Sequence, residues 1–118
     1  MYPGIDSIEI ERLVIAFERQ PKLRERLFTN RERENLRGKG IQSYAARFAG
    51  KEAVLKTLGT GLRGLSWHDV EIVSDSSGEP QVYLSSRAMD LVKARGGFQV
   101  RISLTHNRTQ AMAFAILS

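Results

Sequence analysis

The stretch IQSYAARFAGKEAVLKTL, residues 41–58, is the most strongly periodic segment of the chain. Its apolar side chains recur at the spacing of one helix face, and Gly59 follows directly, as is common where a helix ends. We therefore predict one long helix here, with the rest of the fold packed around it. The predicted apolar face consists of Ile41, Tyr44, Ala45, Phe48, Leu55 and Leu58.

Glu52 interrupts that apolar face four residues after Phe48. A buried carboxylate without a partner is costly, so a basic side chain, a proton or a metal ion should compensate it. Lys56 lies one turn later and could form an ordinary ion pair with Glu52 along the helix. The pattern thus indicates a helix that directs a carboxylate toward the core or toward a cleft.

The segments before this helix predict one strand and two further helices. Residues 4–8 are typical of a short strand, and the apolar spacing from Ile10 predicts a helix that Pro21 ends. Thr29 and Glu32 have the spacing of a capping box, which predicts the start of a short polar helix.

The segments after the long helix are mainly strands. Apolar residues alternate with polar ones in the way that predicts a hairpin and two later strands, with one helix between them. The predicted hairpin strands are residues 69–73 and 81–84, the helix is 86–94, and the later strands are 98–104 and 112–116. We expect an α+β fold, in which a mainly antiparallel sheet packs against the long central helix.

Composition limits the chain to a few classes of protein. With 118 residues, 42% of them hydrophobic, residues 1–118 should form a single domain. The chain has no cysteine, so disulfides and thiolate metal sites are excluded, and any metal would need oxygen or imidazole ligands. Neither a signal peptide nor an apolar run of membrane-spanning length is visible, so we expect a cytoplasmic location.

Basic residues are concentrated in the first third of the chain. The net charge is +5, and nine of the 18 Lys and Arg residues lie between Arg12 and Lys39. Such a cluster would attract nucleic acid, anionic lipid or an acidic protein, and a solvated helix face with interleaved glutamates would have the same composition.

Two carboxylates distant in the sequence, Asp6 and Glu52, could form a Mg²⁺ site. Mg²⁺ prefers oxygen ligands and often takes only one or two protein carboxylates, with phosphate and water completing its shell. Spacing alone leaves the simpler alternative open, in which Asp6 caps a helix and Glu52 pairs with Lys56. The glycine-rich residues 59–61 could approach a phosphate closely, or they could merely end the helix.

Two stretches resemble a known family. GIDSIEIER, residues 4–12, and RFAGKEAVLKTLGTG, residues 47–61, are similar to the signature stretches of the holo-acyl-carrier-protein synthases in the 4'-phosphopantetheinyl transferase superfamily. Similarity continues over residues 67–72, 78–80 and 103–106, so it covers essentially the whole chain. One departure is the start, where the family usually reads Gly-Ile-Gly-x-Asp and this chain reads Pro3-Gly4-Ile5-Asp6.

The resemblance implies an enzyme that moves the 4'-phosphopantetheine group of coenzyme A onto a serine of an acyl carrier protein, a step of fatty acid biosynthesis. It implies Asp6 and Glu52 as Mg²⁺ ligands and, with Lys56 near the pyrophosphate, as the catalytic residues. Glu52 or a metal-bound water held by Asp6 could accept the serine proton. Further residues implied to bind coenzyme A are Arg47, Gly59, Gly61 and His106, and the alternative for His106 is a strand-end residue satisfied by the backbone.

The resemblance also implies the partners. The fold is that of the 4'-phosphopantetheinyl transferases, and the family forms homotrimers with the active site at the subunit interface. The acidic carrier protein would dock on a basic first helix, at Arg12, Arg19, Lys22 and Arg26, and neither nucleic acid nor a membrane would be a partner. The main alternative, a nucleic-acid-binding module that uses the basic cluster, assigns no role to Asp6 and Glu52. A second alternative is a family member without activity that serves as a scaffold.

Overall fold

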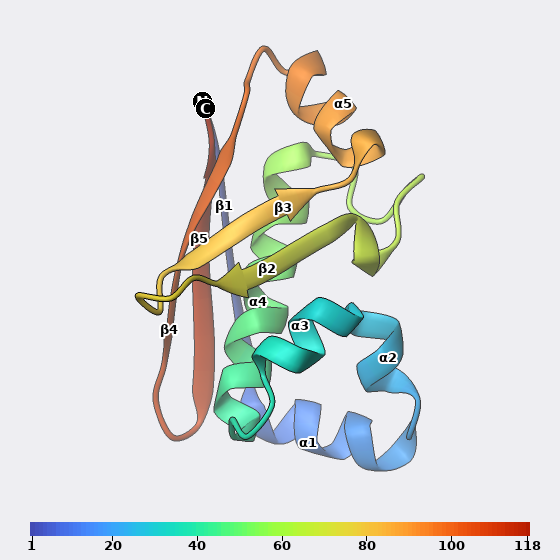
Figure 1. The fold of residues 1–118 in the computed structure, drawn as a ribbon, viewed down its shortest axis with the longest axis vertical. Coiled ribbons are helices and arrows are strands. Elements are labelled where there is room, and N and C mark those ends of the chain that lie inside the picture. Colours follow the sequence, from blue (N-terminus) through green and yellow to red (C-terminus); the bar gives the residue numbers. More distant parts are fainter.

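The long helix α4, Ile41–Leu58, runs through the centre of the computed structural model, which describes residues 1–118 (Figure 1). It begins after Gly40 and ends at Gly59, whose φ of 81° is a left-handed conformation that favours glycine. Both ends therefore agree with the sequence prediction.

A three-stranded antiparallel sheet covers one side of α4. Its strands are β1 (Tyr2–Glu9), β5 (Gln110–Leu117) and β4 (Val100–His106), in the order β1-β5-β4. Alanines meet across the contact between helix and sheet, and these small side chains let the two lie close together. The buried alanines are Ala49 and Ala53 on α4 and Ala111, Ala113 and Ala115 on β5.

A second, two-stranded sheet flanks α4 and also approaches β4. It is the predicted hairpin of β2 (Val70–Ser74) and β3 (Pro80–Leu84), and α5 (Ser86–Ala94) follows it (Figure 1). The prediction of an α+β fold with antiparallel strands and a central helix is confirmed. The strands are divided between two sheets, which approach each other at β3 and β4.

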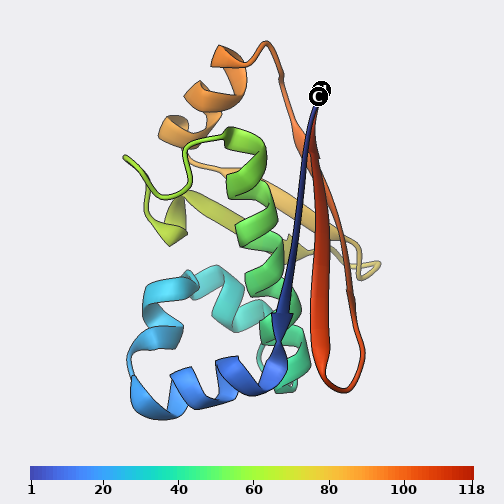
Figure 2. The ribbon, with the colours of Figure 1, turned by 180° about the vertical axis from the view of Figure 1, so that it is seen from behind.

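The N-terminal helices gather around the first half of α4 (Figure 2). They are α1 (Ile10–Arg19), α2 (Leu23–Leu27) and α3 (Asn30–Asn35), and a 3-10 turn, Trp67–Asp69, precedes β2. The predicted capping box is present, because Thr29 and Glu32 exchange hydrogen bonds between side chain and backbone. The five residues of α2 are too few to give a periodic pattern, and this helix was not predicted.

Only one strip of α4 remains accessible beyond its first turn. Tyr44, Phe48 and Glu52 are partly exposed and Lys56 is exposed, whereas most of the remaining side chains from Ala45 to Leu58 are buried. On the predicted apolar face, Tyr44 and Phe48 are only partly buried. The Tyr44 ring packs edge-on against the rings of Phe17 and Phe28, and Phe48 packs against Trp67 and lines a cavity. Other faces of α4 are buried although they carry few large apolar residues, because elements pack against the helix on several sides.

None of the helices combines the length and the apolar composition that a bilayer-spanning helix requires.

Candidate active site

Gly4 lets β1 lie directly against α4. A Cβ atom at this position would clash with the carbonyl oxygen of Ala53, so the backbone of the strand touches the backbone of the helix. Figure 2 shows the two elements side by side. Asp6, two residues farther along β1, has its side chain on the same face as Gly4 and therefore meets the accessible strip of α4.

Asp6 and Lys56 form an ion pair across this contact. The Lys56 Nζ atom lies 3.1 Å from Asp6 Oδ1 and also donates a hydrogen bond of 2.7 Å to the backbone carbonyl of Ile5. The alternative in which Asp6 caps a helix is wrong, because Asp6 lies within β1. Lys56 joins the helix to the strand, whereas the sequence had left open a pair with Glu52 on the same helix.

Glu52 lies beside this pair on the accessible strip. Burial raises the pKa of its carboxyl above the usual range, and the nearby charge of Asp6 raises it further, while Lys56 acts in the opposite direction. The two carboxylates that the sequence placed 46 positions apart are thus close enough to influence one another.

Two cavities meet at Glu52. One, of about 560 Å³, extends along the end of α4 and is lined by Lys56, Gly59, Gly61, Leu62 and Trp67, among others. The other, of about 360 Å³, extends under α1 and α2 and is lined by residues that include Asp6, Arg12, Leu23 and Phe48. Two reacting groups could therefore bind, one in each cavity, and come together at Glu52.

The donor set fits a hard divalent cation. The chain contains no cluster of three or more His, Cys, Asp or Glu side chains, so a metal here would have two protein carboxylates, from Asp6 and Glu52. Mg²⁺ is the common ion that binds with so few protein ligands, because phosphate oxygens and water supply the rest. The negative charge of Asp6 raises the pKa of the Glu52 carboxyl, and a cation between the two carboxylates would relieve this repulsion.

The structure brings some of the predicted coenzyme-binding residues together and leaves two apart. Gly59 and Gly61 line the larger cavity with Lys56, as expected. Arg47 is buried elsewhere, where it donates hydrogen bonds to the carbonyl of Ile72 and to Asn35. His106 is exposed at the end of β4, two strands away from β1, and lines neither cavity.

The four predicted docking residues are all exposed, at one end of the molecule. Arg12 and Arg19 lie on α1, Lys22 lies in the turn that follows, and Arg26 lies on α2. Arg12 also lines the smaller cavity with Asp6 and Glu52, so the basic surface leads to the carboxylates.

The sequence did not identify Leu62 and Trp67, which line the larger cavity, or Leu23, which lines the smaller one. Their apolar side chains are typical of core residues, and no local pattern distinguishes a cavity wall from a core.

The raised pKa of Glu52 predicts a pH-dependent effect of Glu52→Gln. Without metal, ionised Glu52 opposes folding, so the glutamine variant should have the larger free energy of unfolding at about pH 7. This advantage should shrink as the pH falls through the raised pKa of Glu52 and be lost well below about pH 4, where the carboxyl is protonated in both folded and unfolded chains. Urea unfolding across this pH range measures the difference in free energy of unfolding between the variant and the wild type. The exposed Glu25→Gln variant is the control. A difference that does not change with pH would contradict the prediction.

Comparisons with known proteins point to one family. The family model described as the 4'-phosphopantetheinyl transferase superfamily matches residues 2–115. A holo-[acyl-carrier-protein] synthase of Alkaliphilus metalliredigens is 42% identical over 96% of this chain and 94% of the relative. One from Desulforudis audaxviator is 46% identical over 96% of this chain and 88% of the relative.

A solved structure has the same fold over nearly its full length. It is the Helicobacter pylori holo-[acyl-carrier-protein] synthase in complex with coenzyme A, with a TM-score of 0.87 and 30% identity over 98% of this chain and 99% of the other. The chain therefore belongs to the 4'-phosphopantetheinyl transferase superfamily and, within it, to the holo-acyl-carrier-protein synthases.

Proposed function

We propose that the chain transfers the 4'-phosphopantetheine group from coenzyme A to a serine of an apo-acyl carrier protein, and releases adenosine 3',5'-bisphosphate. The observation that carries this proposal is the position of Glu52 where two cavities meet, beside Asp6 and Lys56. Coenzyme A would occupy the larger cavity, and the serine would enter through the smaller one. The cytoplasm remains the predicted location.

The reaction joins the serine oxygen to the β-phosphorus of coenzyme A and breaks the bond from that phosphorus to the oxygen that bridges to the α-phosphate. Negative charge builds up on that leaving oxygen. Lys56, held by Ile5 and Asp6, lines the cavity where the pyrophosphate would lie, and a fixed cation beside it would stabilise this charge.

The serine must also lose its proton. Glu52 lines both cavities, so its carboxylate is placed to accept that proton, and a water held by Asp6 is the alternative acceptor. A Mg²⁺ ion held by Asp6 and Glu52 would, when bound, neutralise the pyrophosphate and keep its oxygens in line for the displacement.

The direct test is transfer itself. Incubation with apo carrier protein, coenzyme A and Mg²⁺ should add one phosphopantetheine to the carrier, as measured by mass spectrometry. Asp6→Asn and Glu52→Gln should each reduce the rate about a hundredfold or more, because each removes a charge from the reacting centre. Asp90→Asn, an exposed carboxylate on α5, should keep the wild-type rate. Wild-type turnover by Glu52→Gln would contradict the assignment.

The basic surface of α1 and α2 is proposed to bind the acidic carrier protein. Its arginines and Lys22 are exposed, and through Arg12 the surface continues into the smaller cavity. Opposite charges accelerate such an encounter and make it sensitive to salt.

Arg19→Glu therefore should raise the KM for the carrier protein about tenfold at low salt and leave the KM for coenzyme A unchanged. Arg19 is preferred to Arg12 because it does not line a cavity with the carboxylates. Lys93→Glu on α5 is the control for an equal change of net charge, and steady-state kinetics at several salt concentrations measures both. Equal rises in the two KM values would argue against docking at this surface.

A homotrimer is proposed as the active assembly. The face of the three-stranded sheet that points away from α4 exposes Ile5, Met112 and Phe114 by 57%, 41% and 44%. Ile5 and Phe114 are paired in register, so they form one apolar patch that a second copy of the chain could cover. In such an assembly, the exposed His106 could reach the site of a neighbouring chain, which it does not reach in its own.

Phe114→Asp should therefore convert a trimer into a monomer, which size-exclusion chromatography with light scattering would detect. Tyr83→Asp is the matched control, since Tyr83 is also 44% exposed but lies on β3 of the other sheet. A wild-type chain that is monomeric at micromolar concentration would refute the trimer.

A further inference from the structure

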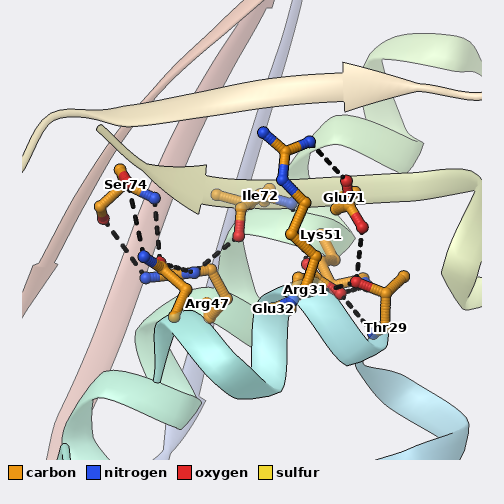
Figure 3. Close-up of polar contacts among 9 residues, drawn as sticks. Thr29, Arg31, Glu32, Arg47, Lys51, Glu71, Ile72 and Ser74 are labelled. Carbon is orange, nitrogen blue, oxygen red and sulfur yellow. Dashed lines mark hydrogen bonds and ion pairs between the residues drawn. The ribbon is translucent and has the colours of Figure 1, made fainter. Parts of the chain in front are cut away.

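The residue before Glu52 is a fully buried lysine with a fully buried partner. Lys51 Nζ lies 2.6 Å from Glu32 Oε1, and both side chains are 0% exposed (Figure 3). The pair joins α4 to α3, and the Lys51 ammonium also lies 5.5 Å from the centre of the Phe28 ring.

Glu32 extends this connection to the hairpin. Its Oε2 atom accepts a hydrogen bond of 2.8 Å from the backbone N–H of Ile72 in β2, and its Oε1 atom accepts one of 2.9 Å from the N–H of Thr29. A single carboxylate therefore fixes α3, α4 and β2 relative to one another.

Arg47 reinforces the contact one helical turn before Lys51. It donates hydrogen bonds to the carbonyl of Ile72, at 2.6 Å, and to the side chain of Asn35, at 3.0 Å. Ile72 thus has its N–H bound by Glu32 and its C=O bound by Arg47 (Figure 3). Because α4 is held at two points along one face, it can neither rotate about its axis nor slide along it without breaking these bonds.

We propose that Glu32 and Lys51 are positioning residues for the reaction, which fix the rotation of α4 and thereby aim Glu52 at Asp6. This inference rests on the proposed function. Consecutive residues of an α-helix lie about 100° apart around its axis, so the direction of Lys51 determines that of Glu52.

A small rotation would be enough to disrupt the site. With side chains, an α-helix has a radius of about 5–6 Å, so a rotation of about 20° displaces a carboxylate by about 2 Å. Mg²⁺ demands nearly ideal octahedral geometry, with oxygens at about 2.0–2.1 Å, and would lose a ligand after such a displacement.

Stability alone does not account for the pair. Buried ion pairs can often be replaced by apolar residues of similar volume without loss of stability, whereas removal of one partner leaves a costly unpaired charge. Apolar packing would not supply a directional bond from α4 to Glu32 and through it to β2. Such a bond fixes the orientation of α4, and this orientation sets the direction of the adjacent Glu52.

The test compares Lys51→Met and Glu32→Gln with Val92→Ala, a buried α5 residue that lies outside the pair. All are measured at about 10 °C, where folding is confirmed by circular dichroism. The first readout is the Mg²⁺ concentration that gives half-maximal transfer. The second needs no turnover, and is the rise in Tm that coenzyme A and Mg²⁺ together produce.

Both variants of the pair should need at least about tenfold more Mg²⁺ and show a smaller rise in Tm, with the KM for the carrier protein unchanged. Val92→Ala should retain the wild-type values for all three. The double variant Glu32→Gln/Lys51→Met should lose no more than either single variant, because the two residues act as one unit. If a single variant does not fold, the double variant is measured in its place, because it leaves no unpaired charge.

Wild-type Mg²⁺ dependence in folded variants of the pair, or an equal change in Val92→Ala, would overturn the inference. Failure of the proposed function is distinguishable, because the wild-type protein would then show neither transfer nor a rise in Tm with coenzyme A and Mg²⁺.

Discussion

The contact of β1 with α4 at Gly4 is the constraint on which the site depends. The missing side chain lets the strand lie against the Ala53 carbonyl, and only at this close distance can Asp6 on the strand reach Lys56 on the helix. A larger residue at position 4 would force the two backbones apart, and every interaction across the site would lengthen with them. The alanines on α4 and β5 extend the same close packing across the sheet.

Each side of α4 has a different task. The alanine side packs on the three-stranded sheet, and the side with Arg47 and Lys51 is bonded to α3 and β2. The remaining strip holds Glu52 and Lys56 at the open cavities. Because the first two sides are fixed, the helix can hold a partly buried carboxylate beside a second one, an arrangement that repulsion between like charges would otherwise disperse.

The sequence predicted the elements well and their contacts poorly, for physical reasons. Helix and strand periods are local, so the bounds of α4, the Thr29 capping box and the hairpin could be read directly. That Asp6 meets Glu52 followed only from the family resemblance, because no local pattern shows which distant segments touch. Phe48 was placed in the core, although it lines a cavity, because periodicity cannot tell a cavity wall from a buried face. The pair of Lys51 and Glu32 was also missed, because a lysine beside a glutamate in a helix normally faces water.

The proposed chemistry requires one divalent cation bound between Asp6 and Glu52. The most direct measurement is a crystal structure of the protein with coenzyme A and Mn²⁺, in which anomalous scattering locates the metal. We expect a single Mn²⁺ with carboxylate oxygens of both residues and a pyrophosphate oxygen in its coordination shell. Coenzyme A bound in the cavity, with Mn²⁺ absent or held by other residues, would contradict it.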